Sequence, residues 1–118
     1  MMNFESLNLF QLASRRLQWL SDKQRAVSEN IANADVAGYR LREVQSFDSY
    51  LDAAGFSPIS PEAEVSQVEA GWGSTISGNT VVMEEQVLEA TNTQSQYRLA
   101  SNLYRKAHEM VLSVAGNR

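Results

Sequence analysis

The stretch FQLASRRLQWLSDKQRAVSENIANA, residues 10–34, carries apolar side chains at alternating intervals of three and four residues. This heptad spacing is typical of a helix that packs a narrow seam against another helix. Neither glycine nor proline occurs between residues 6 and 34. The sequence therefore predicts one N-terminal helix over 6–34, roughly 40 Å long at the helical rise per residue. Its seam consists of Phe10, Ala13, Leu17, Leu20, Gln24, Val27, Ile31 and Ala34.

A second heptad pattern lies at the other end of the chain, over residues 81–115. Acidic residues crowd its first turns and basic residues lie near its end, which agrees with the direction of the helix dipole. Two such stripes predict a mainly α fold, in which long N- and C-terminal helices form an antiparallel coiled-coil hairpin. We expect one side of this packing to consist of Phe10, Leu17, Leu20, Val27 and Ile31, and the other of Tyr97, Leu103, Tyr104, Ala107, Met110 and Val111.

A loop-rich, acidic middle segment, residues 35–80, separates the two predicted helices. It contains both prolines and most of the glycines, so we expect irregular structure. A short helix is predicted around 47–53, and short strands near 64–68 and 75–76. From Glu43 to Tyr97 the chain has nine acidic residues and no basic one. At 118 residues, we expect the whole chain, 1–118, to form a single domain.

Several apolar residues fall beside the two seams, among them Leu12, Trp19, Leu99 and Leu112. One antiparallel partner cannot cover stripes this wide, because a helix presents only a limited arc to its neighbour. Each large apolar side chain left in water forgoes roughly 1.5–3 kcal/mol of burial. We therefore expect helices of other chains to complete the packing. The alternative is an ordinary small bundle in which the short middle helix fills the gap.

The residues that carry catalysis or hold cofactors are scarce. The chain has no cysteine and a single histidine, His108, so we expect no metal site. The tripeptide Gly71-Trp72-Gly73 lacks the lysine that follows in a phosphate-binding loop. Acidic pairs such as Glu84-Glu85 are explained by the start of a helix. We expect no enzymatic activity and no cofactor.

Several classes of partner are also disfavoured. The basic residues form no dense cationic footprint, so we expect no nucleic-acid partner. No apolar run reaches the roughly 20 residues of a transmembrane helix, and the N-terminus lacks the pattern of a cleavable signal peptide. An amphipathic N-terminal helix with four basic residues allows binding at a membrane surface, but acidic neighbours offset its charge. A soluble helical adaptor or export chaperone, acting as a monomer or dimer, remains an alternative to an assembly subunit.

The first seam continues into Asn30-Ile31-Ala32-Asn33-Ala34-Asp35-Val36-Ala37-Gly38-Tyr39. Asparagine is a poor interior helix former, since its amide competes for backbone hydrogen bonds. Near a helix end, the amides of Asn30 and Asn33 can bond the unpaired carbonyls or a neighbouring subunit, and Gly38 suits a turn with positive φ. We interpret Asn30, Asn33 and Tyr39 as an inter-subunit hydrogen-bonding corner. Simple C-terminal capping is the alternative.

This stretch resembles the N-terminal signature of the rod, hook and filament-junction axial proteins of the bacterial flagellum. Val36 and Ala37 replace the threonine and proline that are usual there. Residues 77–81 are similar to the same family, and residues 95–107 are especially similar to its proximal rod proteins. The N-terminal similarity rests on Asn30, Ile31, Ala32, Asn33, Gly38 and Tyr39.

The resemblance implies a structural subunit of the basal-body rod. Its terminal helices would form a coiled coil lining an axial tube, stack with copies of itself and with other rod proteins, and transmit torque. The resemblance also implies contacts with the export gate and with membrane-ring and rod-adaptor proteins at the rod base. It implies a periplasmic location, reached as an unfolded chain through the flagellar type III export channel without a cleaved signal.

Overall fold

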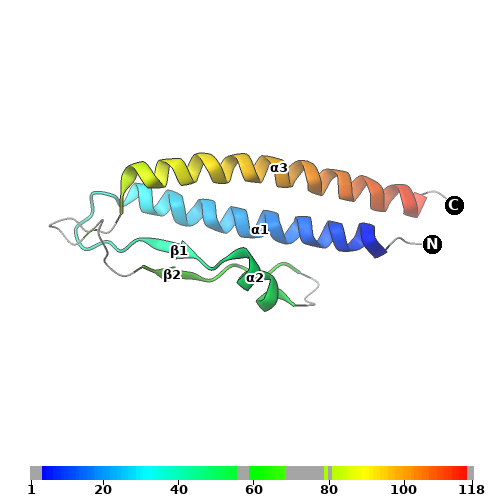
Figure 1. Ribbon diagram of the computed structural model, residues 1–118, viewed down its shortest axis with the longest axis horizontal. Coiled ribbons are helices and arrows are strands. Elements are labelled where there is room, and N and C mark those ends of the chain that lie inside the picture. The colour runs from blue at the N-terminus through cyan, green and yellow to red at the C-terminus, as the bar shows by residue number, and fades with distance from the viewer. Residues whose placement is uncertain (1–3, 56–58, 69–78, 80, 117–118) are drawn as a thin grey trace.

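Two long antiparallel helices dominate the computed structural model, which describes residues 4–55, 59–68, 79 and 81–116. Helix α1 (Phe4–Ala32) and helix α3 (Met83–Gly116) lie side by side along the long axis of the molecule (Figure 1). The molecule measures 66 × 25 × 17 Å. Within the described part of the chain, neither long helix has the run of apolar residues that crossing a bilayer requires.

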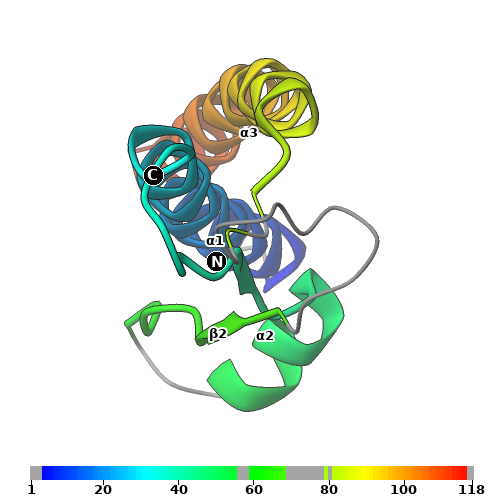
Figure 2. The same ribbon diagram turned by 90° about the vertical axis from the view of Figure 1, so that its left-hand side faces the viewer.

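The middle of the chain folds back along α1. Strand β1 (Arg42–Val44), helix α2 (Phe47–Ala54) and strand β2 (Val65–Gln67) follow one another, and β1 pairs with β2 in antiparallel register. Viewed along the long axis, α1 lies between α3 on one side and these three elements, the hairpin, on the other (Figure 2). The molecule therefore has three layers, with α1 in the centre.

This architecture confirms the predicted fold class: a mainly α protein, whose long terminal helices pack as an antiparallel pair around a middle with short strands. The short helix expected around 47–53 is α2, and the strand expected near 64–68 is β2. Strand β1 was not predicted from the sequence. The strand expected at 75–76 lies outside the described residues.

The chain leaves α1 through a turn that requires a glycine. Gly38 has φ +75°, a conformation that costs residues with a Cβ roughly 1–2 kcal/mol. Backbone hydrogen bonds from Val36 to Asn33 (3.0 Å) and from Tyr39 to Val36 (3.2 Å) close the turn on either side. The turn predicted at Gly38 is thus present, and it delivers the chain to β1.

Helix α2 begins and ends at residues with clear capping roles. The Ser46 hydroxyl accepts a hydrogen bond from the Ser49 backbone N–H, which satisfies one of the free donors of the first turn. Asp48 adds a favourable negative charge at the same end. The helix stops at Gly55, which has φ +51°. These local signals explain why a helix of only eight residues forms here.

The hydrophobic core is centred on the middle of α1. Trp19, Leu20, Tyr50 and Ala100 form its buried cluster, and Phe47 packs against it. Trp19 was expected to need helices of other chains, and this expectation is wrong, since the hairpin of the same chain covers it. The alternative, in which the short middle helix fills the gap, therefore holds on the hairpin side of α1.

Candidate functional site

Asn30, near the end of α1, is the centre of a buried polar cluster. Its side chain is 1% exposed. The amide nitrogen donates to the Arg42 carbonyl (2.9 Å) and to Gln86 Oε1 (3.0 Å). The amide oxygen accepts from the Tyr39 hydroxyl (3.2 Å) and from the Arg42 N–H (3.0 Å). Because an asparagine side chain donates two and accepts two hydrogen bonds, the capacity of Asn30 is used in full within one chain.

Asn79 makes a second tie between distant parts of the chain, just before α3. Its buried amide nitrogen donates to the carbonyls of Asn33 (2.9 Å) and Val36 (2.6 Å). Its side-chain oxygen accepts from the Val81 N–H (2.8 Å). The Asn33 side chain itself donates to the Glu29 carbonyl (2.8 Å). The turn after α1 is therefore fastened to the start of α3.

These contacts change the interpretation of the asparagine motif. For Asn30, the expected bonds to a neighbouring subunit are replaced by four bonds within the chain. Asn33 caps its own helix, as the alternative interpretation had it. Tyr39 is half-buried and its hydroxyl is directed at Asn30. Of the other motif residues, Ile31 is half-buried on the seam, and Ala32 is exposed.

The α1–α3 seam contains most of the predicted packing residues. The rings of Phe10 and Tyr104 lie 4.9 Å apart between centroids, and His108 lies 5.7 Å from Phe10. This aromatic contact joins the beginning of α1 to the second half of α3. Of the predicted residues, Leu20, Val27 and Ala107 are buried, while Phe10, Leu17, Ile31, Tyr104 and Val111 are half-buried.

Three predicted packing residues of α3 lie away from the centre of this seam. Tyr97, Leu103 and Met110 are 43%, 40% and 44% exposed. The heptad position of α3 that points at α1 is instead occupied by small or polar residues. Large side chains at the neighbouring positions are left at the edge of the contact. The buried residues of α3 are Gln86, Thr93, Ala100 and Ala107.

Polar contacts occupy the middle of the seam. Arg16 donates to Gln96 Oε1 (3.2 Å), and Lys23 forms an ion pair with Glu89 (3.1 Å). Among the described residues, two buried side-chain oxygens lack a hydrogen-bond partner, Gln24 Oε1 and Thr93 Oγ1. A buried polar group without a partner costs about 1–3 kcal/mol. The α1–α3 contact is therefore weaker than its heptad pattern suggests.

The contact between α1 and the hairpin, in contrast, has its buried polar groups paired. The Trp19 indole N–H donates to the Gln45 carbonyl (2.7 Å). Buried Asp22 accepts from the Ala63 N–H (2.8 Å), and the Tyr50 hydroxyl donates to the Pro61 carbonyl (2.8 Å). The bonds of Trp19 and Asp22 tie the acidic middle segment to α1, and the Tyr50 bond joins two parts of that segment to each other.

Aromatic rings shape the environment of two titratable groups in this layer. The Arg16 guanidinium lies 4.8 Å from the ring centroid of Trp19 and 4.7 Å from that of Phe47, distances typical of cation–π contacts. Burial lowers the pKa of Arg16 below its ordinary value. Burial also raises the pKa of Tyr50 above its ordinary value.

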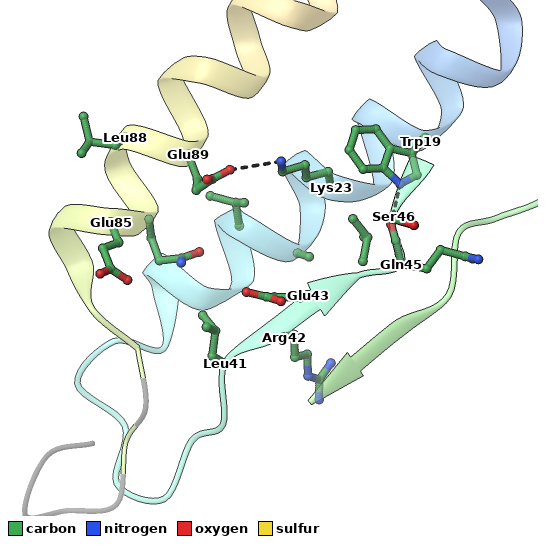
Figure 3. A pocket seen from close by; sticks show the side chains of 14 residues that line it. Trp19, Lys23, Leu41, Arg42, Glu43, Gln45, Ser46, Glu85, Leu88 and Glu89 are labelled. Atoms are coloured by element: carbon green, nitrogen blue, oxygen red, sulfur yellow. Dashed lines mark hydrogen bonds and ion pairs between the residues drawn. The ribbon is translucent and has the colours of Figure 1, made fainter. Parts of the chain in front are cut away.

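A groove of about 620 Å³ runs between α1, β1 and the first turns of α3 (Figure 3). The Lys23–Glu89 ion pair spans it, and the Trp19 indole lies at its far end, bonded to the Gln45 carbonyl just after β1. Arg42 and Glu43 contribute further charged side chains. Over the part of the chain that is described, no three His, Cys, Asp or Glu side chains gather as metal ligands would. The groove thus combines charged side chains of both signs with an apolar floor.

Comparison with known proteins finds similarity to one family. The family model for flagella basal body rod proteins matches residues 10–40, which span most of α1 and the turn that follows. The flagellar basal body rod protein FlgB of Agrobacterium fabrum (strain C58 / ATCC 33970) is 29% identical over 126 aligned positions, covering 93% of this chain and 94% of the relative. Over nearly its whole length, the chain is thus similar to a flagellar basal body rod protein.

The region matched by the family model contains Asn30 and Tyr39 of the buried polar cluster. It also contains the α1 seam from Phe10 onward. The match ends just before β1, so the part of the chain most like the family is the central layer and its turn.

Three buried residues that make these polar contacts were not singled out from the sequence: Asp22, Asn79 and Gln86. Asp22 binds the hairpin, Asn79 the turn, and Gln86 the Asn30 side chain. Only Gln86 left a signal, since it lies in heptad phase with Ala100 and Ala107. The partners of Asp22 and Asn79 are backbone groups more than 40 residues away, and side-chain patterns carry no information about them.

Proposed function

We propose that this protein is a structural subunit of the proximal rod of the bacterial flagellar basal body. It polymerises through its terminal helices, transmits torque and lines the export channel. Its partners are copies of itself and other rod proteins, together with the export gate and the membrane-ring and rod-adaptor proteins at the rod base. The resemblance of residues 95–107 to proximal rod proteins supports this assignment, as does the similarity to FlgB along nearly the whole chain.

The outer face of α3 is the observation that carries the proposal. Leu99 is 71% exposed, and Leu88, Leu103 and Met110, which lie on the same side of the helix, are exposed as well. Burying a large apolar side chain stabilises a structure by about 1.5–3 kcal/mol relative to full exposure. Helix α1, by comparison, is covered on two sides by its own chain. A helix with one covered face and a leucine-rich outer face is suited to packing against other subunits.

The weak seam favours folding that is coupled to assembly. Gln24 and Thr93 leave unpaired oxygens in the α1–α3 contact, so this contact is weaker than one with all its buried polar groups paired. A neighbour that covers the outer face of α3 adds the missing stabilisation. Such a subunit suits export as an unfolded chain and periplasmic assembly at the end of a growing rod. The absence of cysteine also suits passage between compartments of different redox state.

A soluble adaptor or export chaperone is the second candidate, favoured by the satisfied hydrogen bonds of the hairpin and of Asn30. An adaptor is cooperatively folded as a dilute monomer and is absent from the finished rod. A rod subunit gains helix and stability on assembly and remains in purified basal bodies. Circular dichroism of dilute protein and blotting of basal bodies therefore separate the two functions.

The deciding experiment replaces Leu99 and Leu103 by serine together, in a cell whose own copy of the gene is deleted. Both side chains are exposed, so the fold of the purified variant is retained, while swimming and incorporation into basal bodies fall at least tenfold. Val87→Ser is the matched control, because Val87 is 48% exposed and lies about four and a half turns from Leu103, on the opposite side of α3. Normal swimming of the double variant at normal protein level would refute the proposal.

A further inference from the structure

The outer face of α3 combines apolar and basic side chains around a shallow hollow. The hollow has a volume of about 460 Å³ and is formed by α3 alone. Leu99 and Leu103 supply its apolar part, and Met110 is exposed one heptad further along. Arg105 and Lys106 supply two positive charges and Glu109 one negative charge, so the lining carries a net positive charge. A partner for this face needs an apolar side chain flanked by carboxylates.

The outer surface of the hairpin has this chemistry. From Glu43 to Gln67 the chain contains five acidic residues and no lysine or arginine. Ile59 is 77% exposed, the highest value among the exposed large hydrophobic residues described. Apart from Glu43, the acidic residues are Asp48 and Asp52 on α2, with Glu62 and Glu64 before β2, and all four are exposed.

The two surfaces cannot meet within one molecule. They lie on opposite sides of α1 when the molecule is viewed along its long axis (Figure 2). A contact between them therefore joins two copies of the chain. Because the two surfaces differ, the contact is heterologous, and repeating it generates a ring or an open helical array.

We propose that the α3 face around Leu99 and Leu103 binds the hairpin of a neighbouring copy, with Ile59 against the leucines. Arg105 and Lys106 of one copy face the acidic residues of α2, Asp48 and Asp52, in the next. The inference rests on the proposed function, which requires that copies of the chain meet. It goes further by naming which surface meets which.

Charge selects this occupant over the two obvious competitors. A symmetric α3–α3 contact brings Arg105 and Lys106 against the same residues of the partner, and such juxtaposition of like charges is unfavourable. An anionic membrane attracts the face of α3 but leaves Ile59 in water and repels the hairpin. Only the hairpin of another copy supplies both the apolar contact and the carboxylates.

Crosslinking between two differently tagged copies tests the contact in the cell. The natural chain has no cysteine, so single substitutions give unique sites. Asn102→Cys lies in the α3 hollow, and Ala53→Cys lies on the exposed side of α2 beside Asp52. These changes leave every charge in place. The matched control is Gln94→Cys, which is exposed and lies two and a half turns from Leu103, on the far side of α3.

A bismaleimide reagent applied to whole cells joins the Asn102→Cys copy to the Ala53→Cys copy at least tenfold more than it joins Gln94→Cys to Ala53→Cys. Replacing Arg105 and Lys106 by glutamate in the first copy lowers the product at least tenfold. Replacing Asp48 and Asp52 by lysine in the second copy then restores it to within threefold. Such rescue isolates the charge pairing from other effects of the substitutions.

Other outcomes overturn the inference. A product between two Asn102→Cys copies, without the mixed product, indicates a symmetric α3–α3 contact. Protection of Asn102→Cys by anionic vesicles, without the mixed product, indicates a membrane. Blotting of purified basal bodies in the same cells tests the proposed function separately. If the chain is present in basal bodies but the crosslink between Asn102→Cys and Ala53→Cys copies does not form, the docking inference alone is overturned. Its absence from basal bodies overturns the proposed function, while the whole-cell crosslink still decides the contact.

Discussion

Replacing Asn30 by alanine is the sharpest test of the polar cluster that joins the three layers. The substitution removes four hydrogen bonds and leaves Gln86 Oε1 buried without this donor. Typical hydrogen bonds contribute about 0.5–1.5 kcal/mol each, and a stranded buried group costs about 1–3 kcal/mol. In the variant, the backbone groups of Arg42 and the Tyr39 hydroxyl reach water. The free energy lost with each of their hydrogen bonds is therefore at the lower end of the range for typical bonds. We expect the free energy of unfolding to fall by about 4 kcal/mol.

Asn33→Ala is the matched comparison, because Asn33 belongs to the same motif and the same turn of helix. Its side chain makes one bond, to a carbonyl of its own helix, so we expect a loss of about 1 kcal/mol. Urea unfolding followed by far-ultraviolet circular dichroism measures both variants, with trimethylamine N-oxide added to raise the stability of the isolated chain. If both variants lose the same free energy of unfolding, and the slope of that free energy against urea concentration is unchanged, Asn30 is not the centre of the cluster.

Two further predictions follow from single residues of the turn and the hairpin. Gly38→Ala places a Cβ at φ +75° with no heavy atom within 4 Å, so backbone strain alone lowers stability, by about 1–2 kcal/mol. In thermal unfolding, Gly116→Ala should show no such loss, since Gly116 lies at the end of α3 with open space around it. For Tyr50, burial raises the pKa of the phenol in the folded state. The protonated phenol therefore contributes its full share of stability below the pKa of the unfolded chain, about 10. That share is lost as the pH rises above this value. Tyr50→Phe removes this part of the fall in stability at alkaline pH, which urea unfolding measures. A fall in stability as steep as that of the unmodified chain would contradict the raised pKa of Tyr50.

The elements that the sequence predicted well are those in which a local pattern repeats many times. The α1 seam repeats over seven intervals from Phe10 to Ala34, and the predicted long helix and its antiparallel partner are both present. Helix α2 and the turn at Gly38 carry their own local signals, a capping serine and a glycine at positive φ. Strand β1 has no such signal. It is ordered by Asn30, which bonds both backbone groups of Arg42 from outside the sheet.

The candidate site was harder to predict because its contacts depend on which segment of the chain, or which neighbouring molecule, packs on each face of a helix. In the sequence, the asparagines of the motif are equally compatible with capping, with a contact between subunits and with a tie inside the chain. The structure favours a tie inside the chain, because Gln86 and Asn79, which come much later in the sequence, bond Asn30 and the turn after α1. A heptad pattern likewise defines a face of a helix without identifying the partner that covers it.

The two long helices illustrate this limit most clearly, and the comparison explains why the outer face of α3 is the natural place for assembly. Both helices carry apolar residues beside their seams, so the sequence alone treats them alike. Trp19 on α1 and Leu99 on α3 nevertheless have opposite fates, one buried under the hairpin and one exposed. The hairpin can cover only the helix from which it emerges, because the turn at Gly38 and the Asn30 cluster fold it directly back along α1. Helix α3 begins after the hairpin is closed and so has no further part of the described chain to cover it, which leaves its leucines to a neighbour.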